Sequence, residues 1–81
     1  MSERVLVTGV LGCLGAWVAR LLVEEGSAVV GFDLGTEPRR LRELMPEDRI
    51  SRIALVQGDI TGRVAVDAVL DEHGITHVIH L

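Results

Sequence analysis

The 81-residue sequence has no Lys and no Tyr, and its one cysteine is Cys13. A single cysteine cannot form an intramolecular disulfide, so no disulfide framework supports the fold. All eight basic residues are Arg, and they are scattered along a chain with a net charge of −4. Because a nucleic-acid-binding surface needs clustered basic residues, we expect no nucleic-acid partner.

Long apolar runs are also missing. The longest are far shorter than the ~20 residues that a membrane span requires, so no membrane partner is expected. Arg4 is followed at once by a short strand-like run and then by glycines, which is not a signal-peptide pattern. We therefore expect a cytoplasmic protein. Its apolar content of 48% is that of a globular chain, and its length allows one domain at most.

Short apolar runs rich in β-branched residues predict four strands. They lie at residues 5–7, 28–32, 53–56 and 76–81. Connected by helices through right-handed crossovers, they predict an α/β fold of the Rossmann type, a doubly wound parallel sheet that is partial here. The expected element order is β-α-β-α-β-α-β and the expected strand order is 3-2-1-4. The last strand would leave apolar surface and a sheet edge uncovered, which predicts marginal stability or self-association.

Three helices are predicted between the strands. The first shows apolar residues at three- and four-residue steps, namely Leu14, Trp17, Val18, Leu21 and Leu22, and Gly26 is its expected stop. The second spans about residues 39–45, with Pro38 in its first turn and Pro46 at its end. The third is marked by Val64, Ala68, Val69 and Leu70, with Thr61 as a candidate N-cap and Gly74 as a stop.

The glycine-rich turn between the first strand and first helix is the strongest functional signal. Gly9 permits a tight turn, Gly12 permits close approach to a pyrophosphate, and Gly15 permits tight packing of helix on strand. The main-chain N–H groups from Leu11 to Leu14 then face the phosphates at a helix N-terminus. A turn that merely connects the two elements is the alternative. A Walker-type phosphate loop is excluded because it requires Lys.

Asp33 falls 18 residues after Gly15, at the predicted end of the second strand. There a carboxylate can accept hydrogen bonds from the adenosine ribose hydroxyls, and its charge would repel a 2′-phosphate. NAD is therefore favoured as cofactor over NADP. A solvated turn residue is the alternative for Asp33. NADP stays open because Arg39 and Arg40 could reach a 2′-phosphate, although a solvated helix face explains both.

Residues 8–15 read Thr-Gly-x-x-Gly-x-x-Gly, which resembles the extended branch of the short-chain dehydrogenase/reductase superfamily, the NAD-dependent epimerase/dehydratase family. Residues 56–61 and 78–81 resemble two later segments of that family. The resemblance implies that Asp59 and Ile60 flank the adenine and that Leu81 lies along the cofactor; for Asp59 a cap or turn role is the alternative. The expected cofactor-binding set is Gly9, Leu11, Gly12, Cys13, Leu14, Gly15, Asp33, Asp59, Ile60 and Leu81.

Departures from the family pattern affect the subfamily rather than the cofactor. Cys13 and Leu14 replace a common aromatic-aliphatic pair, and Gly62 stands where an Asp often begins the third helix. Cys13 is interpreted as a small filler, and His80 as a buried strand residue. His73 and His77 show no metal-ligand spacing, so no metal site is predicted.

The resemblance implies that residues 1–81 are the amino-terminal part of an NAD(P)-binding Rossmann domain, with the substrate domain absent. The whole protein would be an oxidoreductase acting on a sugar nucleotide or a similar polar small molecule, and a homodimer is open. Its chemistry would rest on a Tyr-x-x-x-Lys pair, and the chain has neither residue type. No catalytic residue is therefore predicted, and the chain alone is expected to be inactive. A non-catalytic dinucleotide sensor and a ligand-free structural domain are the alternatives.

Overall fold

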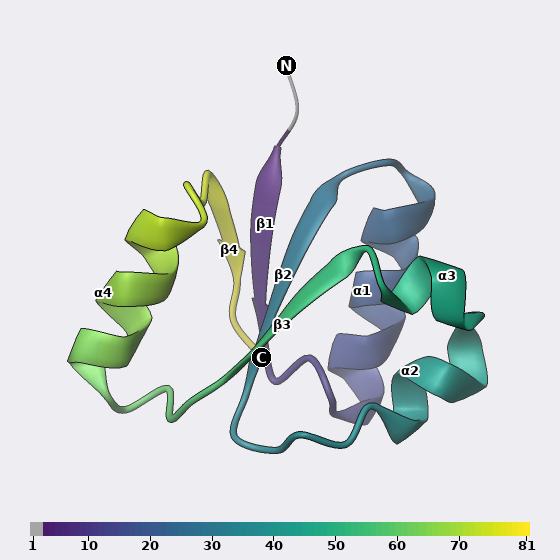
Figure 1. The fold of residues 1–81 in the computed structure, drawn as a ribbon, viewed down its shortest axis with the longest axis horizontal. Helices are drawn as coiled ribbons and strands as arrows, with labels where there is room; N and C mark the ends of the chain where they lie inside the picture. Colours follow the sequence, from purple (N-terminus) through teal and green to yellow (C-terminus); the bar gives the residue numbers. More distant parts are fainter. Residues whose placement is uncertain (1–2) are drawn as a thin grey trace.

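The computed structural model describes residues 3–81 and shows a four-stranded parallel sheet between two helical layers (Figure 1). The strands are β1 (Arg4–Thr8), β2 (Ala28–Asp33), β3 (Ile53–Gln57) and β4 (His77–Ile79). Their order is β3-β2-β1-β4, which confirms the predicted Rossmann arrangement. One face carries α1 (Cys13–Glu24), α2 (Arg39–Leu44) and α3 (Glu47–Ile50), and the other carries α4 (Arg63–Glu72). Within residues 3–81, no helix has the length and apolarity to cross a membrane.

The sheet separates two apolar cores because successive strand residues point to opposite faces. Val5 and Val7 of β1 pack beneath α1 to α3, whereas Leu6 packs with Phe32 and Val69 beneath α4. Both faces of β1 and β2 are buried. The two edge strands are less covered, since β3 buries one residue and β4 buries none.

Helix α1 forms where predicted, but three of its large apolar residues do not face the core. Leu14, Trp17 and Leu21 are 63%, 45% and 56% exposed. The buried positions are instead Gly15, Ala16, Ala19 and Val23. Small side chains let the helix axis lie close to the sheet, and this proximity excludes the larger ones from the buried face. Apolar spacing therefore located the helix correctly, but of the predicted stripe only Val18 and Leu22 pack partly against the core.

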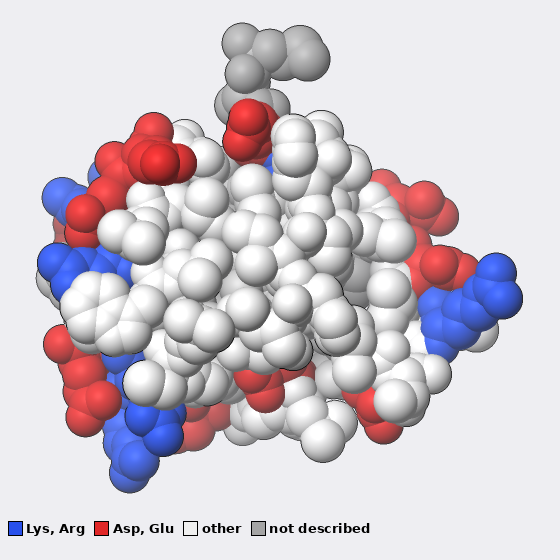
Figure 2. Space-filling model, turned by 180° about the vertical axis from the view of Figure 1, so that it is seen from behind, with Lys and Arg blue, Asp and Glu red and all other residues white. Residues whose placement is uncertain are grey.

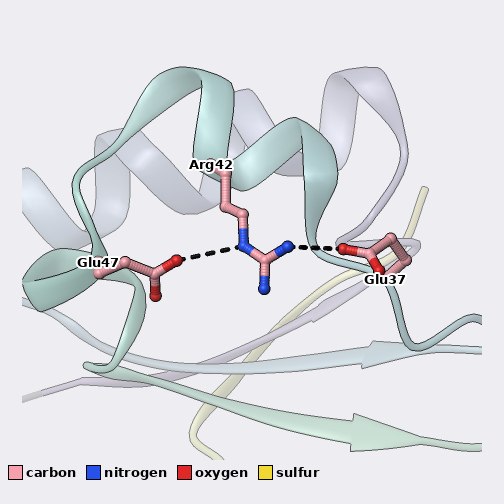
Figure 3. A network of polar contacts seen from close by, with 3 residues as sticks. All are labelled: Glu37, Arg42 and Glu47. Atoms are coloured by element: carbon pink, nitrogen blue, oxygen red, sulfur yellow. Dashed lines mark hydrogen bonds and ion pairs between the residues drawn. The ribbon is translucent and has the colours of Figure 1, made fainter.

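The chain after β2 contains two short helices rather than one. Pro46 ends the region of α2 as predicted, but its φ of −71° also suits the start of α3, which sequence reasoning missed. Arg42 bridges this corner, with Nη1 2.8 Å from Glu37 Oε1 and Nε 3.2 Å from Glu47 Oε1 (Figure 3). Exposed ion pairs contribute at most about 1 kcal/mol each. Burial of Leu41 and Ile50 therefore stabilises the segment from α2 to α3, and the ion pairs orient the two short helices.

Helices α1 and α4 end just before the glycines that were predicted to stop them. Gly26 and Gly74 have φ of +87° and +57°, the left-handed conformation that terminates a helix at low cost in glycine. The predicted N-cap of the last helix was wrong. Gly62 occupies that position without a side-chain cap, because the Thr61 hydroxyl is hydrogen-bonded to Asp59 instead.

Gly15 sets the distance between α1 and the β1 turn, and its replacement should be costly. A Cβ there would clash with the Gly9 carbonyl oxygen and lie 2.8 Å from Val10 Cα. We expect Gly15→Ala to lower the free energy of unfolding by about 1–3 kcal/mol or more, the cost of overpacking. Chemical denaturation followed by circular dichroism measures it.

Gly35→Ala is the matched control for this prediction. A Cβ at Gly35 would make ordinary contacts, 3.6 Å from Asp33 Oδ1 and 3.7 Å from Leu11 Cδ1. Its stability should stay within about 1 kcal/mol of the parent chain. Equal losses in the two variants would contradict a specific role for close packing at Gly15.

Candidate functional site

The carboxyl ends of all four strands meet at one edge of the sheet and enclose a cavity of about 210 Å³. This edge, where the strand order reverses, is where open α/β sheets bind ligands. Five predicted site residues line the cavity: Gly9, Asp33, Asp59, Ile60 and Leu81. The other five, Leu11, Gly12, Cys13, Leu14 and Gly15, follow Gly9 along the turn and the first turn of α1.

The glycine turn is held by main-chain hydrogen bonds. Gly9 has φ of +70°, and its N–H donates to the Phe32 carbonyl of β2 at 2.8 Å. The Gly12 N–H donates to the Gly9 carbonyl at 3.0 Å, and the Leu11 N–H donates to Asp33 Oδ2 at 3.0 Å. Both N–H groups are thus engaged, which corrects the expectation that every N–H from Leu11 to Leu14 is available.

The remaining donors lie at the start of α1. None of the hydrogen bonds found among residues 3–81 uses the N–H groups of Cys13 or Leu14. They belong to the first turn of a 12-residue helix, where unpaired N–H groups and the helix dipole favour an anion. Gly12 leaves the approach to them free of a side chain. The geometry fits a pyrophosphate at this turn.

Asp33 connects two loops through its carboxylate. Besides accepting from Leu11, it accepts the Gly35 N–H on Oδ1 at 3.0 Å. Two carboxylate oxygens offer about four lone-pair positions, so the group retains capacity for further donors such as hydroxyls. The contact with Gly35 is an Asx turn that an Asp-x-Gly sequence favours. The contact with Leu11 depends on the adjacency of β1 and β2, which sequence reasoning did not use.

Thr8 forms a polar connection that sequence reasoning missed. Its side chain is only 3% exposed, and its Oγ1 lies 2.8 Å from His80 Nδ1 and accepts the Leu81 N–H at 3.1 Å. The hydroxyl therefore joins the end of β1 to the segment after β4. His80 is half-buried just beyond β4 and contacts this hydroxyl, which is a positioning role. The only available signal was a hydroxyl that directly follows the apolar run of residues 5–7.

Asp59 lies in a tight turn after β3. The Thr61 hydroxyl and N–H donate to its Oδ1 at 2.7 and 2.9 Å. These hydrogen bonds, the hydroxyl first, lower the pKa of the Asp59 carboxyl below its ordinary value of 3.8. The turn role considered as an alternative for Asp59 is therefore present, and its side chain still borders the cavity.

Metal-binding chemistry finds no support in the described part of the chain. Residues 3–81 contain no group of three or more His, Cys, Asp and Glu side chains placed to hold a metal ion. Cys13 is exposed at the start of α1.

Removing the Thr61 hydroxyl should change the titration of Asp59. We expect Thr61→Ala to raise the pKa of the Asp59 carboxyl toward 3.8, because one of two donors to the carboxylate is lost. Since the pKa is lowered in the folded state, the hydrogen bonds stabilise the fold above about pH 4 and are lost as the pH falls through the folded pKa. NMR titration of the carboxyl carbon measures the shift. Thr61→Ser keeps the donor and should leave the pKa low; a rise in both variants would contradict this cause.

The Thr8 hydroxyl should contribute to stability. Thr8→Val keeps the shape of the side chain and leaves His80 Nδ1 and the Leu81 N–H without this partner. We expect a loss of about 1–3 kcal/mol in the free energy of unfolding. Thr8→Ser retains the hydroxyl and should lose less in the same denaturation measurement. If Thr8→Val lost less free energy of unfolding than Thr8→Ser, the polar connection would not stabilise the fold.

Comparison with known proteins supports the motif assignment. Residues 6–81 match the family model described as GDP-mannose 4,6 dehydratase. A probable dTDP-glucose 4,6-dehydratase from Sinorhizobium fredii is 32% identical over 78 residues, covering 96% of this chain and 22% of the relative. The curated relatives are much longer, and this chain spans between a fifth and a quarter of their length.

Two solved structures share the fold. The Bordetella bronchiseptica enzyme WbmH in complex with NAD+ superposes with a TM-score of 0.78 at 28% identity, covering 100% of this chain and 26% of that one. UDP-glucose 4-epimerase from Bifidobacterium longum, in complex with NAD+ and UDP, gives 0.83 at 25% identity, covering 98% and 24%. With its glycine turn, its strand order and a family model that matches nearly its whole length, the chain belongs to the GDP-mannose 4,6-dehydratase family of extended short-chain dehydrogenases/reductases.

Proposed function

We propose that this chain binds NAD at the carboxyl edge of its sheet. The carrying observation is that Gly9 and Asp33 line the 210 Å³ cavity while Asp33 also accepts the Leu11 N–H of the glycine turn, which leads directly to the free N–H groups of Cys13 and Leu14. The N–H groups would hold the pyrophosphate, and Asp33 would accept the adenosine ribose hydroxyls. Asp59 and Ile60 would flank the adenine, and Leu81 would lie further along the cofactor.

The preference for NAD over NADP rests on the position of Asp33. Its carboxylate would face a 2′-phosphate with like charge, while it can accept hydrogen bonds from a ribose hydroxyl. Arg39 and Arg40 border a hollow of about 240 Å³ together with Leu11 and Glu37, and both are exposed. Arg42 is the neighbour that pairs with Glu37. The two other arginines are exposed to solvent and do not line the 210 Å³ cavity that Asp33 borders.

For the whole protein we propose an NAD-dependent epimerase or dehydratase that acts on a sugar nucleotide. The named relatives support this, since they are a probable dTDP-glucose 4,6-dehydratase and UDP-sugar epimerases. When bound, NAD would supply hydride transfer. The residues present here would bind and orient the cofactor, because the chain has no Tyr and no Lys to form the acid/base pair expected of the family. We accordingly propose residues 1–81 as the amino-terminal part of the cofactor-binding domain.

Calorimetric titration of the purified chain with NAD and with NADP tests the proposal. We expect NAD to bind and NADP to bind more weakly. Asp33→Ala should weaken NAD binding about 10- to 100-fold, the worth of a charge-assisted hydrogen bond, and should reduce the discrimination against NADP.

The control for this titration is Asp67→Asn, which removes an exposed carboxylate on α4 that does not line the cavity. It should bind NAD as the parent chain does. Circular dichroism separates a lost contact from a lost fold, because Asp33 also holds the Leu11 N–H. Unchanged binding of both nucleotides by a folded Asp33→Ala variant would refute the ribose assignment, and absence of NAD binding by the parent chain would refute the site.

A further inference from the structure

The single phenylalanine of the chain forms one wall of the 210 Å³ cavity. Phe32, the last residue but one of β2, borders the cavity although only 2% of it is exposed. The rest of its surface packs in the core beneath α4, with Leu6, Val30 and Val69. A ring enclosed by close-packed neighbours has few alternative rotamers, so this wall of the cavity is rigid.

Gly58 makes room for the ring of Phe32. Phe32 pairs with Val56 of β3, and Gly58 follows Val56 by two residues, so the three lie on the same face of the sheet. The Gly58 N–H continues the ladder by donating to the Asp33 carbonyl at 2.9 Å. A Cβ at Gly58 would lie 2.6 Å from Phe32 Cζ and 2.9 Å from its Cε2, well inside the ~3.5–4.0 Å of an ordinary carbon contact. The ring therefore occupies the space that a side chain at position 58 would fill.

The backbone conformation at position 58 does not itself require glycine. Among residues 3–81, the glycines with a left-handed φ are Gly9, Gly26 and Gly74. Gly58 is not one of them, so its backbone could carry a side chain without strain of its own. The room that Phe32 needs is thus the reason that the structure gives for glycine there. The two residues form a pair, since a larger residue at position 58 would need a smaller one at position 32.

The charges around the cavity favour a neutral group over a phosphate. Among its described lining residues, Asp33 and Asp59 are acidic and none is Arg. Hydrogen bonds from Thr61 hold the pKa of the Asp59 carboxyl low, so this group is ionised at neutral pH. Along the lower middle of Figure 2, at the end of the molecule where the strands terminate in Figure 1, acidic side chains lie among uncharged ones and no Lys or Arg is seen. A flat, uncharged ring with polar edges suits a wall of this kind beside carboxylates.

We propose that Phe32, lying over Gly58, is the wall against which the nucleobase of the cofactor packs, and that this pair sets the depth of the base subsite. The proposal rests on the proposed function, because it takes the cofactor to bind in this cavity. Contact between an aromatic ring and a base is favourable for any base, so Phe32 would contribute affinity while the polar groups around it choose the base. Neither residue belongs to the set expected from sequence, because a phenylalanine in an apolar strand has the pattern of a core residue.

A double-variant cycle on NAD binding, measured by calorimetry, tests the pair. Gly58→Ala should push the ring into the cavity and weaken NAD binding about tenfold, within the range of coupling between contacting residues. Phe32→Leu removes the part of the ring that the new Cβ would meet, so the double variant Phe32→Leu/Gly58→Ala should recover most of that loss. Val23→Ala is the control for lost stability, because Val23 is buried in the core on the other face of the sheet and does not border the cavity. It should bind NAD as the parent chain does.

An NMR measurement on the parent chain completes the test and needs no variant to fold. Since the chain has one Phe, labelling of phenylalanine marks this ring alone. With NAD bound, we expect nuclear Overhauser effects between the ring protons of Phe32 and the adenine protons, and none to the nicotinamide protons. NAD binding without the adenine contacts, NAD binding by Gly58→Ala equal to that of the parent, or no recovery in the double variant would each overturn this proposal and leave the proposed function standing. A parent chain that binds no NAD would instead refute the proposed function, and the base subsite with it.

Discussion

The close approach of α1 to the turn after β1 is the constraint on which the rest of the structure depends. It exists because Gly15 has no Cβ at a point where one would meet the Gly9 carbonyl oxygen and lie 2.8 Å from Val10 Cα. The same proximity explains why Ala16 and Ala19 form the buried face of the helix and why larger side chains point outward. It also brings the first N–H groups of α1 to the edge of the sheet, so the packing of the core and the position of the proposed anion site have one cause.

Asp33 links that turn to the neighbouring strand. By accepting from Leu11 and Gly35, its carboxylate fixes the glycine turn relative to the loop after β2. Thr8 does the same on the other side, joining the end of β1 to His80 and Leu81. The cavity walls are thus held together by side-chain hydrogen bonds between elements distant in sequence. This arrangement explains how so small a chain can keep a shaped cavity at its edge.

Local patterns predicted most of this fold. Runs of β-branched residues located all four strands, and Gly26 and Gly74 end their helices as expected. The errors share a physical origin in tertiary packing, which single-segment patterns do not contain. Leu14 and Leu21 have helical spacing but lie outside because Gly15 and the alanines occupy the contact.

The features that the sequence did not predict also depend on tertiary packing. Pro46 was interpreted as a stop, although Ile50 has enough burial to support another helical turn after it. Thr61 bonds to Asp59 instead of capping α4, and the Thr8 connection spans elements at opposite ends of the sequence. In the proposed site, the positions of the glycines and Asp33 at the carboxyl ends of β1 and β2 were predictable because their spacing is local. Which N–H groups remain free was not, since this depends on how β1 and β2 sit together.

Amide NMR of the chain during addition of NAD tests the central claim most directly. If the first turn of α1 holds the pyrophosphate, the amide resonances of Cys13 and Leu14 will shift in proportion to occupancy, because they are the free donors of that turn. Those of Ser51 and Arg52, at the far end of α3, will stay in place. Shifts confined to residues outside the glycine turn, or none with NAD in large excess, would contradict the account.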